Sequence, residues 1–291
     1  QYIVEYKKMM MAYELLLKVS IVHCKLSIVL KFFRGCKAMS DSITIIDEDK
    51  VIDVVLIAGR ILLESGAETY RVEDTMTRIA ASFGLDDTYS FVTSTAIIFS
   101  LNNRTNTRLV RIRERTTDLE KIALTNSLSR KISNDELNID QAKSELVHLH
   151  HASLQYSSIT NFLAAPIACG FFLFMFGGII QDFIFAIIAG AGAFLTFNYV
   201  QRYIQIKFFS EFISAAVVIM IASTFTKIGW AHNQDIITIA GVMPLVPGIL
   251  ITNAIRDLMA GELLAGMSRG VEAALTSFAI GAGVAIVLLI F

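Results

Sequence analysis

The second half of the chain has few charged residues, and proline and cysteine are scarce throughout. Of the 25 Lys and Arg and the 26 Asp and Glu, only five basic and six acidic residues lie beyond Gln155. Apolar stretches of 18 or more residues with few charges are typical of membrane spans, because the hydrocarbon core needs about 20 helical residues. A soluble core needs no succession of such stretches, so the pattern excludes an ordinary soluble domain there.

The three cysteines, Cys24, Cys36 and Cys169, are an odd number without a CxxC spacing. They therefore indicate neither a disulfide framework nor a zinc site, and Cys169, inside an apolar run, is interpreted as a packing residue. The sequence also lacks GxGxxG, P-loop, GxSxG and HExxH motifs. We therefore predict that the protein is not an enzyme and has no cofactor.

A histidine cluster precedes the first apolar stretch. His148 and His151 share one helix face and could form a metal pair, with His150 beside them. Histidines before a membrane entry are usually interfacial or solvated, and no carboxylate motif completes a ligand set. We therefore predict no metal site.

The first 38 residues are apolar but interrupted by charges, such as Glu14, Lys18 and Lys31. A charge at the middle of the bilayer costs about 2.5–3.5 kcal/mol on insertion scales, so we expect no span there. We expect the functional chain to begin at Met39, with residues 1–38 as a dispensable extension.

Residues 39–157 are predicted to form a small α+β cytosolic domain. Amphipathic helices are indicated by apolar residues at three- and four-residue steps. Their ranges are Asp47–Glu64, Thr69–Phe83, Asp118–Ile132 and Asp135–His150. Tyr89–Leu101, a turn at Asn102–Asn106 and Arg108–Arg113 read as a β-hairpin. Its arginines, Arg108, Arg111 and Arg113, are predicted to form one basic face.

Residues 158–291 are predicted to form a transmembrane domain, so the fold class is a mainly α integral membrane protein with about five transmembrane helices. The predicted spans are Ile159–Ile180, Phe183–Val200, Phe208–Thr226, Ile236–Ile255 and Val271–Phe291. Lys and Arg are more frequent in alternate loops, on the side of the N-terminal half. By the positive-inside rule we expect a multi-pass protein of the cell membrane, with its N-terminus cytosolic and its C-terminus outside.

The fourth predicted span contains two of the three prolines, in Met243-Pro244-Leu245-Val246-Pro247-Gly248. Proline removes a backbone donor and clashes with the preceding turn, so Pro244 and Pro247 should unwind the helix near its midpoint. Unpaired backbone at that depth is tolerated where it lines a wet cavity, as in the broken helices of transporters. A structural kink alone is the alternative. We predict that Pro244, Pro247 and Gly248 belong to a substrate path.

Polar residues follow this break, and Asn253 and Asp257 lie four residues apart on one helix face. We place both in the transport path, with Asp257 at the cytosolic mouth. The alternative makes Asp257 an ion-pair partner of Arg256 or Arg269. Glu211, near the start of the third span, joins the candidates because intramembrane acids often relay protons or ions; it could instead lie at the membrane interface.

Charged residues also gather at Glu68, Arg71, Glu73 and Asp74. They could be catalytic, although a solvated, salt-bridged first helical turn is the commoner interpretation of such a cluster.

Two separated motifs resemble the threonine/serine exporter family. The first is Leu63-Glu64-Ser65-Gly66-Ala67-Glu68-Thr69-Tyr70-Arg71-Val72-Glu73-Asp74, continued by Val92-Thr93-Ser94-Thr95-Ala96-Ile97. The second is Leu245-Val246-Pro247-Gly248-Ile249, followed by Asn253-Ala254-Ile255-Arg256-Asp257-Leu258. The resemblance covers about residues 47–291. It implies export of threonine and serine or of dicarboxylates such as succinate, and it supports functional roles for Glu68, Pro247, Gly248, Asn253 and Asp257. We predict Gly66, Glu68 and Arg71 as the motif of the cytosolic domain.

Single-chain members of that family carry about ten spans, so this chain resembles the larger subunit of the split, two-component form. Together with the break in the fourth span, the resemblance leads to the hypothesis of a secondary-exporter subunit that is driven by the proton gradient. The expected partners are the lipid bilayer, a small polar metabolite and a separate small membrane subunit or further copies of this chain, without nucleic acid. The alternative is a regulatory or binding subunit whose partner forms the pore.

Overall fold

The computed structural model describes residues 48–101, 107–154 and 156–290. The expected extension 1–38, the expected start at Met39 and the predicted turn at 102–106 lie outside these residues. The chain divides into the units Gln1–Asp49 and Lys50–Phe291. Apart from the first two residues of its first described helix, every element below belongs to the second unit.

The four predicted amphipathic helices are present. They are α2 (Glu48–Glu64), α3 (Thr69–Ser82), α4 (Leu119–Ser133) and α5 (Ile139–His151). Their apolar faces meet one face of a sheet in a shared core, in which Phe99, Met76 and Leu146 are fully buried. Gly66 adopts a positive φ of 88° after α2, a conformation that glycine adopts without the penalty other residues meet.

The sheet has three antiparallel strands in the order β1 (Thr88–Val92), β2 (Ala96–Leu101) and β3 (Arg108–Arg111). The prediction of a two-stranded hairpin is therefore wrong, because Tyr89–Leu101 contains two strands and not one. The chain turns at Thr93, whose side-chain oxygen accepts hydrogen bonds from the backbone N–H groups of Thr95 and Ala96. Such a hydroxyl-capped turn contains no Gly, Pro or Asn and is easily read as continuous strand.

The prediction of one basic face is also wrong. Arg108 pairs with Phe99, and Arg111 pairs with Ala96. Because side chains alternate along a strand, Arg108 shares its face with Val110, whereas Arg111 lies on the other face.

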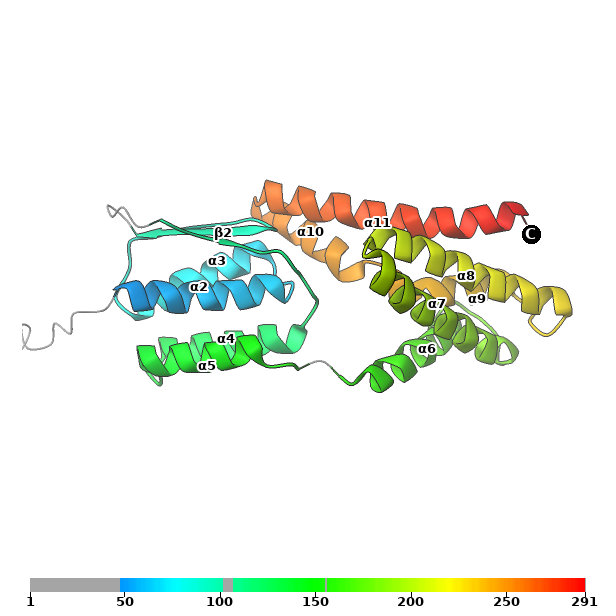
Figure 1. The fold of residues 1–291 in the computed structure, drawn as a ribbon, viewed down its shortest axis with the longest axis horizontal. Coiled ribbons are helices and arrows are strands. Elements are labelled where there is room, and N and C mark those ends of the chain that lie inside the picture. The colour runs from blue at the N-terminus through cyan, green and yellow to red at the C-terminus, as the bar shows by residue number, and fades with distance from the viewer. Residues whose placement is uncertain (1–47, 102–106, 155, 291) are drawn as a thin grey trace, which may run out of the picture. The chain divides into compact units, whose positions relative to one another are not determined.

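The apolar half is helical. Its elements are α6 (Ser158–Met175), η1 (Ile180–Asp182), α7 (Phe183–Ile204), α8 (Lys207–Ile228), α9 (Gln234–Val242), η2 (Met243–Leu245), α10 (Gly248–Ala260) and α11 (Leu263–Ile290) (Figure 1). Among the described residues, three helices are long and apolar enough to cross a membrane, or four if the bent pair α9–α10 is one span. The five predicted spans are thus matched only in part.

The difference lies in α6, which ends five residues before the predicted end of its span. Gly177 adopts a positive φ of 78°, and Gly178 donates its backbone N–H to Leu173 O at 2.9 Å. This left-handed C-terminal turn ends the helix at Met175. The pair Gly177-Gly178 therefore stops the helix rather than providing a packing surface inside it.

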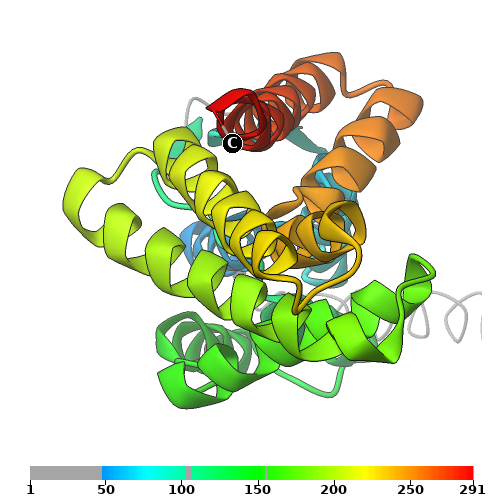
Figure 2. The ribbon, with the colours of Figure 1, turned by 90° about the vertical axis from the view of Figure 1, so that its right-hand side faces the viewer.

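The apolar helices pack closely around α7 and α8. Helix α7 lies between α6 and α8, and α11 lies along α8 (Figure 2). A Cβ atom on Gly283 would meet Phe212 O at 2.3 Å, so the backbones of α11 and α8 are nearly in contact. Small residues allow such close approach where lipid supplies no hydrophobic drive for association.

Candidate functional site

The predicted break is present between α9 and α10. Pro244 lies in η2, Pro247 precedes α10, and Gly248 begins it, with a bend of 61° between the two helical pieces. Neither proline has a backbone N–H to donate, which accounts for the break.

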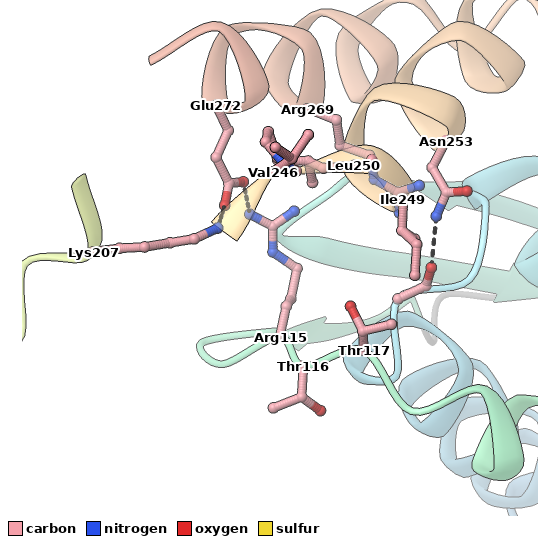
Figure 3. Close-up of a pocket in the computed structure, with 13 residues that line it drawn as sticks. Arg115, Thr116, Thr117, Lys207, Val246, Ile249, Leu250, Asn253, Arg269 and Glu272 are labelled. Carbon is pink, nitrogen blue, oxygen red and sulfur yellow. Dashed lines mark hydrogen bonds and ion pairs between the residues drawn. The ribbon is translucent and has the colours of Figure 1, made fainter. Parts of the chain in front are cut away.

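Two cavities adjoin this break and have Lys207 and Pro247 in common. The first has a volume of about 260 Å³ and the second of about 470 Å³. The first is lined by Gly66, Arg115, Thr116, Thr117, Lys207, Val246, Pro247, Gly248, Ile249, Leu250, Asn253, Arg269 and Glu272 (Figure 3). The second is lined by Asn161, Ala164, Ala165, Ala193, Phe194, Phe197, Asn198, Lys207, Glu211, Pro244, Leu245 and Pro247.

The loop Gly66–Thr69 is bound to the helix that follows the break. The Asn253 amide donates a hydrogen bond of 2.8 Å to Gly66 O (Figure 3), and Arg256 Nη1 donates one of 2.6 Å to Glu68 Oε1. We call the contacts of this loop with α10 and α11 the loop–helix contact. It joins the two sequence motifs, which lie 188 residues apart at Glu68 and Arg256.

Asp257 lies at the centre of the loop–helix contact. Its Oδ1 accepts hydrogen bonds from the backbone N–H and the hydroxyl of Thr69, at 3.0 and 2.9 Å. Its Oδ2 lies 2.9 Å from Arg269 Nη1, and Arg269 Nη2 donates to Ala67 O at 2.7 Å. Asp257 is fully buried and Arg269 is 2% exposed. Both residues make further hydrogen bonds, which buried charges require. Among the described residues, Asp257 Oδ2 and Arg269 Nη1 have no hydrogen-bond partner and face each other only as an ion pair.

Glu68 also lies inside the loop–helix contact, and only 4% of it is exposed. Burial alone would raise the pKa of its carboxyl. A backbone hydrogen bond, the hydrogen bond from Arg256 and the charges of Arg71 and Arg256 outweigh burial and hold this pKa below its ordinary value. The interpretation of a solvated first helical turn is therefore wrong for Glu68. It remains apt for Asp74, which is exposed and pairs with Arg78.

Glu73 has a structural partner as well, because its Oε1 accepts a hydrogen bond of 2.7 Å from the backbone N–H of Val92. Burial raises the pKa of this carboxyl.

His150, from the histidine cluster, lies 3.7 Å from Glu64, and its pKa is lowered, chiefly by burial. In the ranges that the structure describes, no three His, Cys, Asp or Glu side chains are grouped so that they could hold a metal ion.

The first cavity is lined by a chain of three charges. Glu272 of α11 accepts hydrogen bonds from Arg115 Nη2 at 2.8 Å and from Lys207 Nζ at 3.1 Å (Figure 3).

At the opposite end of the bundle, Asp182 accepts hydrogen bonds from the backbone N–H groups of His232 and Asn233. The start of α8 and the first half of α11 are therefore adjacent, as are η1 and the α8–α9 connection.

The structure thus divides the predicted site residues into three groups. Gly66, Pro247, Gly248 and Asn253 line the first cavity, and Pro244, Pro247 and Glu211 line the second. Glu68, Arg71 and Asp257 line neither and belong to the ion pairs of the loop–helix contact. The alternative interpretation of Asp257, as a partner of Arg269, fits this geometry.

Sequence reasoning missed Arg115, Lys207 and Thr69 as site residues. Lys207 carried a usable signal, because it precedes Glu211 by four residues and must share its helix face. Thr69 lies within the first motif, but its partner Asp257 could not be inferred, and Arg115 carried no signal, since both have partners distant in sequence.

Comparison with known proteins gives two matches. A family model described as "Putative threonine/serine exporter" matches residues 53–291. A curated protein of Mycobacterium tuberculosis, described as "Probable threonine/serine exporter", is 24% identical over 227 residues, which cover 76% of this chain and 42% of the relative. The chain therefore spans less than half the length of that relative. No solved structure matches.

Proposed function

Since this chain belongs to the threonine/serine exporter family, a family of membrane transporters and not of enzymes, we propose that it is a subunit of a secondary exporter. It moves small polar metabolites, either threonine and serine or dicarboxylates such as succinate, out of the cell at the expense of the proton gradient. Because the chain spans 42% of the relative's length, we propose that it works with a separate small membrane subunit or with further copies of itself.

One observation carries this proposal: a broken apolar helix adjoins two cavities, each lined by apolar residues together with a few charged and amide side chains. Backbone groups that proline leaves unpaired need protein or water as partners wherever they are shielded from bulk water. Pro247 lies at the point that both cavities share, with charged and amide side chains around it. Sites of this kind, at the interruption of a helix, bind substrates and ions in transporters.

In this proposal, residues 39–157 are cytosolic and residues 158–291 cross the membrane five times, with α6 as the shortest crossing. The cytosolic side carries Lys207, Arg256 and Arg269, so the C-terminus lies outside. Gly66, Glu68 and Arg71 connect the cytosolic domain to the helix that contains the break.

The direct test is transport in proteoliposomes that contain the full chain, alone and with the small subunit. Counterflow of labelled threonine, serine and succinate is measured, together with uptake under a pH gradient. Pro247→Ala restores a backbone donor at the break and should abolish transport. Pro166→Ala is the matched control, because Pro166 lies inside α6 and lines neither cavity. Absence of transport of all three substrates would refute the proposal.

A second candidate is a regulatory subunit whose partner forms the pore. A cavity of about 550 Å³ in the α+β part favours it. Glu64 and Glu114 line this cavity together with Arg60, which pairs with Glu64. Arg111 and Arg113, which line it as well, are therefore the side chains that could bind an anionic effector. Transport by the small subunit alone, stimulated by this chain and no longer stimulated by an Arg111→Gln/Arg113→Gln variant, would support this function over the first.

A further inference from the structure

Glu211 is a buried carboxyl in the apolar half without an ion-pair partner among the described residues. It lies four residues into α8, only 3% of it is exposed, and it lines the larger cavity. Its Oε2 atom has no hydrogen-bond partner. An uncompensated carboxylate ion removed from water is costly, so such a group is most stable while it holds a proton.

Few charged groups face Glu211. Lys207 lies on the same helix, and α11 contributes Glu272 and the Thr276 hydroxyl. The other polar groups of the cavity are the uncharged amides of Asn161 on α6 and Asn198 on α7. Lys207 is therefore the one cation that adjoins Glu211 among the residues that line this cavity.

In this structure Lys207 forms an ion pair with Glu272 and not with Glu211, because its Nζ atom lies 3.1 Å from Glu272 Oε1. Glu272 also binds Arg115 at 2.8 Å, so it would keep a cationic partner if Lys207 moved away. Residues four apart on a helix face each other, which brings an ionised Glu211 within reach of Lys207. Lys207 lines both cavities, and a change of partner would carry its charge from the smaller to the larger one.

We propose that Glu211 is the carboxyl that takes up and releases the coupled proton, and that Lys207 exchanges Glu272 for Glu211 when the proton leaves. The proton passes from the carboxyl to water in the larger cavity, which leaves a carboxylate, and the Lys207 ammonium keeps its own protons. Release of the proton therefore moves the positive charge of Lys207 out of the smaller cavity and pairs it with the new negative charge of Glu211 in the larger one. This assignment rests on the proposed export function and adds the residues that couple it to protons.

The test separates exchange from proton-driven transport. The full chain, with the small subunit where transport requires it, is reconstituted into liposomes with labelled threonine, serine or succinate. Counterflow at equal pH needs no net proton movement, whereas uptake under a pH gradient does. Glu211→Gln keeps the shape and fixes the neutral form, so it should retain counterflow, independent of pH, and lose gradient-driven uptake. Glu136→Gln, an exposed site in the α+β part, is the matched control and should behave as the wild type.

Lys207→Gln tests the change of partner. Without its cation, ionised Glu211 is disfavoured, so the pH profile of gradient-driven uptake should move to more alkaline values. A Glu211→Gln variant that keeps gradient-driven uptake overturns the proposal. Loss of counterflow in this variant also overturns it, because Glu211 would then bind substrate or support the fold.

A measurement without substrate distinguishes failure of this proposal from failure of the export function. Infrared difference spectra of the liposome-embedded protein, acidic against alkaline, should contain a protonated-carboxyl band that is missing from Glu211→Gln. If the wild type transports none of the substrates but shows this band, the export function fails and the protonation of Glu211 stands. Absence of the band refutes the protonation of Glu211 whatever the transport result.

Discussion

Asp257 provides the sharpest prediction, because the structure favours one of two accounts of it. If it stabilises the loop–helix contact, Asp257→Asn should reduce the free energy of unfolding and the amount of protein in the membrane. The protein that remains should transport with an unchanged pH profile. If Asp257 instead admits substrate or a proton at a cytosolic mouth, the variant should be as abundant as the wild type and transport poorly.

The size of the effect follows from the burial of the pair. The side chains of Asp257 and Arg269 are 0% and 3% exposed, with 2.9 Å between Oδ2 and Nη1. Removal of one charge from a buried pair costs about 3–5 kcal/mol, since the other charge is left uncompensated. The asparagine oxygen can still accept from Thr69, so we expect about 3 kcal/mol, at the lower end of that range.

Denaturant unfolding in detergent measures this cost, within a double-mutant cycle of Asp257→Asn and Arg269→Gln. Because the two residues share one interaction, the free energy of unfolding of the double variant should fall by less than the sum of the decreases in the two single variants. Arg202→Gln, at an exposed arginine of α7, is the control and should be neutral. Wild-type stability of Asp257→Asn, combined with lost transport, would refute the reasoning.

Three further predictions concern other parts of the chain. Gly66→Ala should lower stability by about 1–2 kcal/mol in thermal unfolding, because Gly66 has a φ of 88°, where a Cβ atom is strained. The lowered pKa of Glu68 means that its ion pairs stabilise the fold above its ordinary pKa, and this stability should be lost as pH falls through the lowered value; Glu68→Gln should remove that part of the pH dependence. Gly283→Ala should weaken the packing of α8 with α11, whereas Gly281→Ala, which meets nothing within 4 Å, should be neutral or stabilising in the same melting assay.

The sequence predicted those features that local chemistry determines. The helices of the α+β part followed from their apolar periodicity, and the break at Pro244 and Pro247 followed from the missing backbone donors. The turn at Thr93 was missed, because hydroxyl-capped turns resemble strand in composition. The early end of α6 was missed because a glycine pair in an apolar run serves either as a packing surface or as a stop.

The site could be predicted only in part, because its contacts are distant in sequence. The polar neighbours of Glu68 suggested a solvated carboxyl, whereas its partner Arg256 comes from 188 residues further along. The same separation hid the pairing of Thr69 with Asp257. The cavity residues on the broken helix were recognisable, since the proline pair identifies them directly.

The loop Gly66–Thr69 is synthesised long before the helices that bind it in the loop–helix contact. At about 5–20 residues per second, the ribosome needs roughly 10–40 s to advance from Gly66–Thr69 to their partners on α10 and α11. During that interval the carbonyl groups of Gly66 and Ala67 lack their native donors, and Glu68 lacks Arg256. Closure of this contact must therefore wait until the last helices have been made. A nascent chain halted before Asn253 should leave the loop open to proteolysis, and one released after Arg269 should protect it.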